Sequence, residues 1–274
     1  MSETAAMNGA EWLARALAGT GMSPVFFVES TLRRTLLHLR DLGVRPILAH
    51  SEKAAAYMAD GYARVAGRPG VCMAQSVGAA NLAAGLQDAW LGRSPVIAFS
   101  GRKEPAFQHR NAYQEIPHAP LCAAVTKFSS PVESTADLPR LLRHAWRAAL
   151  AETSRPTHLD CNGVQGEVIE LGQTHASPTL ETEARGMPVH RPVADASDIA
   201  RAAALLTGAR RVAIVAGDGA AVSKAGPDVL ALAEVLAAPV ATTLGARGLM
   251  PTLHRLSAGG RGPLCGAADQ PHRA

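Results

Sequence analysis

Apolar and polar positions alternate along the first 160 residues between two kinds of pattern. Short runs that are apolar throughout predict buried strands, at 23–28, 46–49, 71–76, 95–101 and 157–161. Apolar residues three and four positions apart predict helices, at 9–19, 31–43, 52–66, 78–91 and 137–152. Strands of this kind separated by helices indicate an α/β fold, with a mostly parallel sheet covered by helices on both faces. The segment between the fourth strand and the last helix has no strong period and is expected to be a loop.

The pattern changes after residue 162. Residues 163–192 are rich in Gly, Pro, Thr and Glu and have no sustained period, which predicts an interdomain segment. We therefore expect a first domain over 1–165, a linker over 166–192 and a partial second α/β domain over 193–274. The second domain has two predicted helices and only two predicted strands, fewer than in an ordinary sheet, at 196–209, 226–238, 211–217 and 239–244.

Composition narrows the class of protein. Of the 274 residues, 47% are hydrophobic and 18% are charged, which is typical of a globular protein with a real core. The net charge of +4 is scattered without a basic run, which argues against a nucleic-acid-binding protein. The four cysteines form no CxxC pair, so we expect neither a disulfide framework nor a zinc site. No signal peptide or membrane-spanning run is recognisable, and we expect a cytoplasmic protein.

Several motifs for specific chemistry are weak or missing. The turn "GDGAA" at 217–221 lies between a predicted strand and a helix, but Val222 takes the place of the third glycine of a dinucleotide-binding turn. A tight turn is the better interpretation, and NAD binding stays an alternative. His50 and Glu52 lack a third ligand for a metal, and no GxSxG nucleophile elbow occurs.

Three consecutive segments carry polar or small residues where strands end. Glu52 opens an alanine-rich helix directly after a strand, where a carboxylate also suits the positive end of the helix dipole. The loop "SVGAAN" at 76–81 is small enough to let a ligand or another backbone approach. The polar segment 111–128 follows the next strand. Open α/β sheets bind ligands at the carboxyl ends of their strands, so these segments predict a site.

These segments resemble the pyrimidine-binding domain of thiamine-diphosphate enzymes of the acetolactate synthase group. The family's typical motifs have counterparts in "HSEKAAAYMADGYAR" (50–64), "PVIAFSG" (95–101), "AYQE" (112–115) and "TKF" (126–128). The stretch "PVATTLGARGLMP" (239–251) is similar to the family's central domain, near which FAD or an ADP-like group often lies. The resemblance covers about residues 9–257, and it implies a thiamine-diphosphate-dependent carboligase or decarboxylase acting on 2-oxo acids.

The resemblance also implies roles for individual residues. Glu52 would hydrogen-bond N1′ of the cofactor's aminopyrimidine and favour the tautomer that removes the proton from thiazolium C2, which requires a positioned carboxylate. Gln114 and Lys127 would line the substrate channel and are, with Glu52, the catalytic candidates. The residues expected beside the cofactor are Glu52, Ser76, Gly78, Ala79 and Asn81.

Departures from the family limit what is expected. Ser51 and Phe128 replace two family histidines, and "SVGAAN" lacks the family's proline, so carboligases and decarboxylases other than acetolactate synthase remain open. A Mg²⁺- and diphosphate-binding domain, with its GDG motif and following asparagines, is not recognisable, and Gly217–Gly219 falls in the central-domain pattern. We therefore expect a truncated chain, inactive alone, whose end results from a frameshift or early stop. It would form a homodimer, which we expect to be inactive, or a dimer with a chain carrying the missing domain. The alternative is a non-catalytic remnant or a partner-binding subunit that only dimerises.

Overall fold

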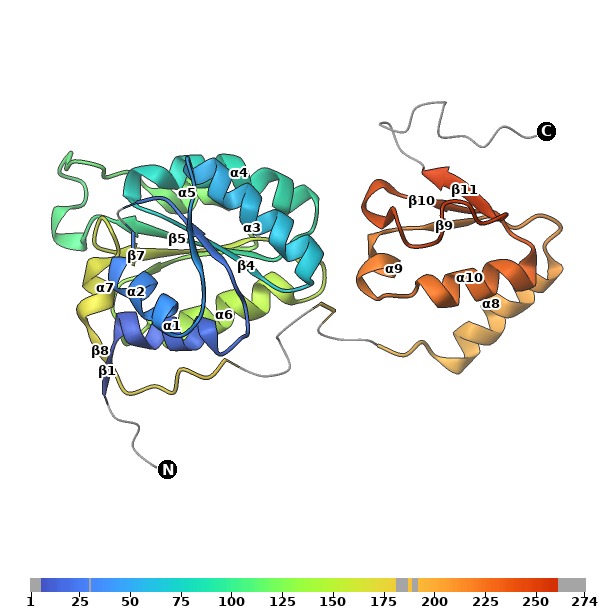
Figure 1. The fold of residues 1–274 in the computed structure, drawn as a ribbon, viewed down its shortest axis with the longest axis horizontal. Coiled ribbons are helices and arrows are strands. Elements are labelled where there is room, and N and C mark those ends of the chain that lie inside the picture. Colours follow the sequence, from blue (N-terminus) through green and yellow to red (C-terminus); the bar gives the residue numbers. More distant parts are fainter. Residues whose placement is uncertain (1–5, 30, 181–186, 189–191, 261–274) are drawn as a thin grey trace. The chain divides into compact units, whose positions relative to one another are not determined.

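The computed structural model describes residues 6–29, 31–180, 187–188 and 192–260 (Figure 1). The chain divides into two compact units, Met1–Val189 and His190–Ala274. No helix among the described residues is long and apolar enough to cross a membrane.

The first unit is built on a six-stranded sheet in which all neighbouring strands are parallel. The strands lie in the order β3 (Pro46–Leu48), β2 (Val25–Phe27), β4 (Gly70–Ala74), β5 (Val96–Arg102), β7 (Thr157–Asn162) and β6 (Phe128–Val132). The chain therefore runs from β2 outward to β3 and then returns past β2 to β4. This reversal is the kind of switch point at which open α/β sheets bind ligands.

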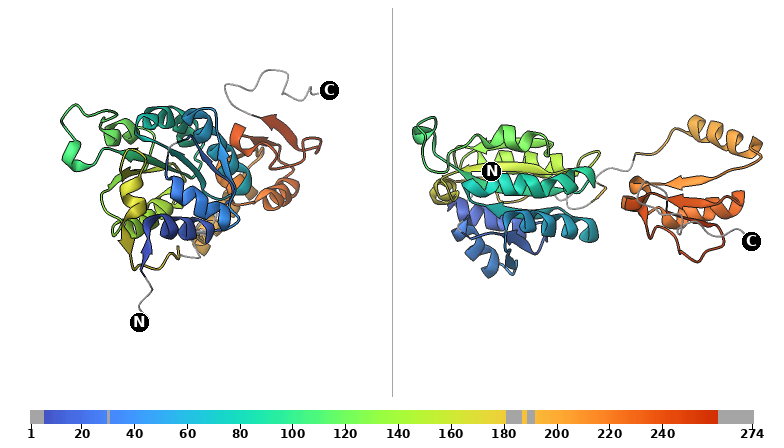
Figure 2. Two further views of the ribbon diagram at one scale, coloured as in Figure 1. Left: turned by 60° about the vertical axis from the view of Figure 1, so that its left-hand side comes forward. Right: turned by 90° about the horizontal axis from the view of Figure 1, so that it is seen from above.

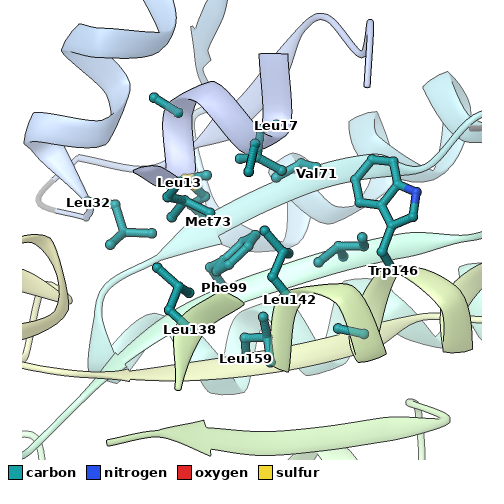
Figure 3. Close-up of a cluster of buried hydrophobic side chains, with 14 of the residues drawn as sticks. Leu13, Leu17, Leu32, Val71, Met73, Phe99, Leu138, Leu142, Trp146 and Leu159 are labelled. Atoms are coloured by element: carbon teal, nitrogen blue, oxygen red, sulfur yellow. The ribbon is translucent and has the colours of Figure 1, made fainter. Parts of the chain in front are cut away.

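Helices cover both faces of this sheet, as the sequence pattern predicted (Figures 1 and 2). Alternate strand residues, among them Val71, Met73 and Phe99, join one core with helices α1 (Gly9–Ala18), α2 (Arg33–Asp41) and α6 (Leu138–Leu150). Figure 3 shows these side chains filling the space between the sheet and those helices. The intervening residues Cys72 and Ala74 face α3 (Glu52–Ala66) and α4 (Ala79–Leu91) instead. The α/β class expected from the pattern is therefore confirmed.

The α3 and α4 helices pack closely because small residues line their interface. A Cβ atom at Gly85 would lie 2.6 Å from the Cβ of Ala56 and 2.8 Å from the carbonyl oxygen of Lys53. Ala55 and Ala59 are fully buried in the same core. The alanine-rich sequence after Glu52 thus serves packing, and it fixes where the first turn of α3 lies.

Two parts of the first unit differ from the sequence-based expectation. The segment expected to be a loop contains β6 and a short helix, α5 (His118–Ala123). β6 is the edge strand, and its Pro131 and serines removed the apolar signal while remaining compatible with an edge position. Within the expected linker 166–192, the chain forms α7 (Glu167–Leu171) and β8 (Gln173–Thr174), which pairs with β1 (Met7–Asn8). Elements this short have no measurable period.

The second unit contains a three-stranded parallel sheet in the order β11 (Ser257–Gly260), β10 (Val240–Thr242) and β9 (Ile214–Ala216). Its described helices are α8 (Ala196–Gly208), α9 (Asp218–Val222) and α10 (Gly226–Leu236). The pattern predicted β9 and β10, whereas β11 was missed because "SAGG" lacks the β-branched and aromatic residues typical of strands.

Candidate functional site

The candidate site lies at the carboxyl ends of β3 and β4, on either side of the switch point. Ser51 caps α3, because its Oγ accepts a hydrogen bond from the backbone N–H of Ala54 at 3.2 Å. Glu52 is therefore the first helical residue, and its carboxylate suits the positive end of the α3 dipole. The local sequence fully explains why a helix begins here. It does not explain what the Glu52 side chain faces.

The Glu52 carboxylate is half-buried and is held from the neighbouring loop. Asn81, in the first turn of α4, donates a hydrogen bond from Nδ2 to Oε2 of Glu52 at 3.0 Å. This contact joins residues 29 positions apart and orients one oxygen, while no hydrogen bond to Oε1 is found among the described residues. The carboxylate is thus positioned by the protein with one acceptor oxygen left for another group.

Gly78 keeps the space beside this carboxylate open. A Cβ atom there would come within 2.7 Å of Cγ and 2.8 Å of Oε1 of Glu52, and within 2.9 Å of the Cβ of Ala74. Contacts this short would force the Glu52 side chain to move. The glycine therefore allows a close approach, and the group that approaches is the Glu52 side chain rather than the ligand or backbone expected from the sequence. Ser76 and Ala79, also predicted at this site, are buried on either side of Gly78.

The loop after β5 is tied to the same edge through Ser76. Its hydroxyl donates a hydrogen bond to the backbone carbonyl of Gln114 at 2.6 Å. Gln114 adopts a left-handed backbone conformation with φ of 61°, which is uncommon for a residue other than glycine. The Oε1 atom of its side chain is buried and has no hydrogen-bond partner among the described residues. The structure therefore brings Gln114 to the loop that carries Gly78 and leaves it a free acceptor.

Lys127 lies elsewhere in the first unit. It precedes β6, at the amino end of the parallel strands, whereas Glu52 and Gly78 lie at the carboxyl ends. Its Nζ atom donates to the backbone carbonyls of Ala151 at 2.7 Å and Thr153 at 3.1 Å. Partial burial lowers the pKa of its ammonium group. Within this unit the structure does not bring Lys127 together with the other predicted residues.

The "GDGAA" turn of the second unit follows β9, as the pattern predicted. Thr243, which follows β10, donates a hydrogen bond to Oδ1 of Asp218 at 3.2 Å, and a Cβ atom at Gly245 would collide with that carboxylate. These contacts join two neighbouring strand-end loops of the same sheet. They support the interpretation as a tight structural turn. Across the described part of the chain, no cluster of three or more His, Cys, Asp or Glu could hold a metal ion.

Comparisons with known proteins agree with this geometry. Residues 7–121 match the model of the thiamine pyrophosphate enzyme N-terminal TPP binding domain, and residues 199–270 match the central domain of the same enzymes. The chain belongs to the thiamine pyrophosphate enzyme family. Together the two matches include Glu52, Gly78 and Gln114 in the first unit and the GDGAA turn in the second. The family resemblance drawn from the sequence motifs is thereby confirmed.

Individual relatives are moderately similar over most of this chain. A probable acetolactate synthase large subunit of Methanocaldococcus jannaschii is 32% identical over 92% of this chain and 43% of its own length. The acetolactate synthase isozyme 2 large subunit of Escherichia coli is 35% identical over 85% of this chain and 40% of its own. A probable 2-ketoarginine decarboxylase of Pseudomonas aeruginosa is 32% identical over 92% and 44%. This chain therefore spans less than half the length of these relatives.

Proposed function

We propose that the first unit binds the aminopyrimidine half of thiamine diphosphate, and that the protein acts as a carboligase or decarboxylase on 2-oxo acids. The observation that carries this proposal is the Glu52 carboxylate, oriented by Asn81 and left uncovered by Gly78. Membership of the family and relatives named as acetolactate synthases and a 2-ketoarginine decarboxylase support it. Acetolactate synthase is named for its product and 2-ketoarginine decarboxylase for its substrate, and both names describe the chemistry of 2-oxo acids.

The residues present fit the pyrimidine ring of the cofactor. A ring nitrogen that carries a proton donates a hydrogen bond, and a carboxylate oxygen is a suitable acceptor. Oε1 of Glu52 accepts no hydrogen bond from the described residues. The Asn81 amide restricts the carboxylate to one orientation, so its proton affinity and its geometry are both held. Gly78 keeps a side chain from filling the space beside it, and buried Ser76 and Ala79 complete the small-residue wall.

Thiamine diphosphate, when bound, supplies an acidic carbon that adds to the carbonyl carbon of a 2-oxo acid. The role that we assign to Glu52 is to hold a proton between its Oε1 atom and the ring nitrogen. We assign to Gln114 the recognition of substrate at the same edge, because its loop is fastened to Ser76 and its side-chain oxygen lacks a partner among the described residues. To line the substrate channel, Lys127 would have to lie near the carboxyl ends of the strands that carry the site, and the first unit alone does not place it there.

We assign no Mg²⁺ ligand to the described residues, which contain no cluster of three or more His, Cys, Asp or Glu side chains, and the proposal assigns no residue to the diphosphate. These groups would be held by other residues of the assembly, which fits a site shared with a partner chain. Binding of FAD or an ADP-like group by the second unit follows from the family's central domain and stays a prediction. A partner-binding role without catalysis is the alternative that the experiment below separates.

Calorimetry and turnover of Glu52→Gln test the proposal. Glutamine keeps the size and an acceptor but cannot hold the proton, so we expect thiamine diphosphate with Mg²⁺ to bind with less than about tenfold loss of affinity. Turnover of pyruvate should fall at least about a hundredfold, the lower range for loss of general acid–base catalysis. Glu11→Gln is the matched control, since Glu11 lies in the first turn of α1 and its carboxylate pairs with Arg15 at 2.7 Å, away from the proposed site.

The outcomes separate the alternatives. Turnover is measured in an assembly that also supplies the Mg²⁺ and diphosphate ligands, and cofactor binding without any turnover of the wild type there would favour the partner-binding role. A Glu52→Gln protein that turns over pyruvate at the rate of the wild type would contradict the proposal. Absence of thiamine diphosphate binding by the wild type would contradict it as well.

A further inference from the structure

A cavity lies over the carboxyl ends of β5, β7 and β6. Its volume is about 240 Å³, and its lining includes four basic side chains. We call it the Arg102 cavity, after the residue that ends β5; its polar lining includes Arg102, Lys103, Gln108, His109, His118 and Asp160. Neither Glu52 nor Gly78 lines it; Glu52 follows β3, two strands beyond β4, whereas Gly78 follows β4, the neighbour of β5. The cavity is therefore distinct from the proposed pyrimidine site.

A buried chain of hydrogen bonds lies beneath the Arg102 cavity. The donor and the acceptor of each bond follow from the donation of Ser100 to Asp160. Asp160 Oδ1 accepts from the Ser100 hydroxyl and from Nδ1 of His118, the latter at 3.0 Å. Because Ser100 donates its only proton to Asp160, its oxygen accepts from Nε2 of His158 at 2.8 Å. The Ser129 hydroxyl then donates to Nδ1 of His158 at 2.9 Å. This network satisfies both ring nitrogens of His158 and the Ser100 hydroxyl, and it fixes the floor of the cavity.

Above this floor, basic groups lack acceptors. The Arg102 side chain is only 18% exposed, yet its nearest carboxylate oxygens, on Asp160 and Glu133, are both 3.9 Å away and too distant for hydrogen bonds. The ammonium group of Lys103 lies 5.9 Å from the centre of the Phe107 ring and makes no hydrogen bond or ion pair among the described residues. Nε2 of His118 is also buried without a partner in that part of the chain, but because Nδ1 of this ring donates to Asp160, Nε2 of the uncharged ring is an acceptor. The poorly paired donors of Arg102 and Lys103 are costly unless something supplies acceptors.

We propose that the Arg102 cavity binds the oxyanion of a small molecule, a carboxylate or a phosphate. The planar guanidinium of Arg102 offers paired donors that match two oxygens of such a group, and Lys103 adds a second positive charge. Two carboxylates also line the cavity, and the protein holds both by hydrogen bonds: Asp160 accepts within its network, and Glu115 accepts from the backbone N–H of His109 at 3.1 Å. The cavity is smaller than most drug-sized pockets, which suits a molecule of few atoms.

The alternative is that Arg102 serves only to join the strand ends through Asp160 and Glu133. Two ion pairs at 3.9 Å would contribute little, because ion pairs without hydrogen bonds are weak. That alternative also leaves the unpaired Lys103 and the cavity itself without a role. The inference does not depend on the proposed function, since none of the residues assigned to the cofactor lines the cavity.

Titration calorimetry of the full chain tests the inference, with pyruvate, 2-oxoglutarate and inorganic phosphate as separate probes. Thiamine diphosphate is left out, and chloride keeps the ionic strength constant. We expect saturable binding of one equivalent of at least one probe, and the probe that binds more tightly identifies carboxylate or phosphate as the ligand. Arg102→Gln should weaken binding at least tenfold and Lys103→Gln about threefold. Arg40→Gln removes the same charge at an exposed site on α2 and should change nothing.

Circular dichroism and thermal unfolding of each variant show whether it is folded. If Arg102→Gln does not fold, Lys103→Gln decides, because the ammonium group of Lys103 makes no hydrogen bond or ion pair among the described residues. Absence of saturable binding of all three probes by the wild type would overturn the inference. Binding that is equally tight in the Lys103→Gln and wild-type proteins would also overturn it, as would a folded Arg102→Gln protein that binds like the wild type.

Discussion

His158 is a buried base whose two ring nitrogens are both committed to serines, Ser100 and Ser129. Burial lowers the pKa of its imidazole to about 4, below the ordinary value of about 6.5. Between these two values the unfolded chain binds a proton that the folded chain does not, so stability falls as the pH is lowered through this window. We predict a loss of up to about 3 kcal/mol between pH 7 and pH 4 from this residue alone, since one pKa unit is worth about 1.4 kcal/mol.

Urea unfolding midpoints between pH 7 and pH 4 measure this loss. The His158→Asn protein keeps hydrogen-bonding capacity without titrating, and its midpoint should fall less steeply with pH than that of the wild type. His50→Asn changes an exposed histidine of the same unit and should preserve the wild-type slope. Parallel profiles for His158→Asn and the wild type would show that His158 does not cause the pH dependence.

At the scale of elements, the contact between α3 and α4 positions Glu52, and two glycines test it. A Cβ atom at Gly85 would overlap Ala56 and the backbone of Lys53, whereas one at Gly61, in the middle of α3, would meet nothing within 4 Å. Alanine favours a helix over glycine by about 1 kcal/mol at either position. Overpacking costs about 1–3 kcal/mol, so Gly85→Ala should destabilise the protein or leave it unchanged, while Gly61→Ala should stabilise it by up to about 1 kcal/mol.

Thermal unfolding and cofactor calorimetry of the two glycine variants are the measurements. Because Lys53 follows Glu52 directly, Gly85→Ala should also weaken thiamine diphosphate binding, and Gly61→Ala should not. Equal stabilisation by both substitutions would mean that the helices separate freely and that their packing does not position Glu52.

The elements differ in how far the sequence predicts them. The bounds of α3 follow from local signals, because Ser51 caps its start and Gly67 ends it in a left-handed conformation. The sequence could predict that Glu52 and Gly78 lie at the same edge of the sheet, since both follow strands of one parallel sheet, but not that they are in contact. β6 was not foreseeable, because an edge strand with a proline lacks an apolar pattern. The Arg102 cavity was not foreseeable either, since it depends on β7 entering the sheet between β5 and β6.

At the scale of the whole molecule, the contacts decide where the first folded unit ends. Residues after 165 complete the core of that unit: Ile169 is 1% exposed, and Glu170 accepts a hydrogen bond from the backbone N–H of Thr35 at 2.7 Å. Beyond them, Gly172 accepts from the backbone of Gly9 at 2.9 Å, and Ala176 accepts from the indole of Trp12 at 2.8 Å. A first domain over 1–165, as the sequence pattern predicted, would lose the buried Ile169 side chain and all three of these hydrogen bonds.

We therefore predict that a fragment of residues 1–180 is markedly more stable than one of residues 1–165. Removing a buried isoleucine side chain alone costs about 2–5 kcal/mol, which corresponds to roughly 5–15 °C in the melting temperature of a unit this size. Calorimetry of both fragments measures the difference, and Ile169→Ala in the longer fragment should melt between them. Equal melting temperatures would place the boundary at 165 and would mean that α7 and β8 only rest on a core that is already complete. A lower melting temperature for 1–165 would instead show that α7 and β8 stabilise the helices and sheet whose strand ends carry Glu52.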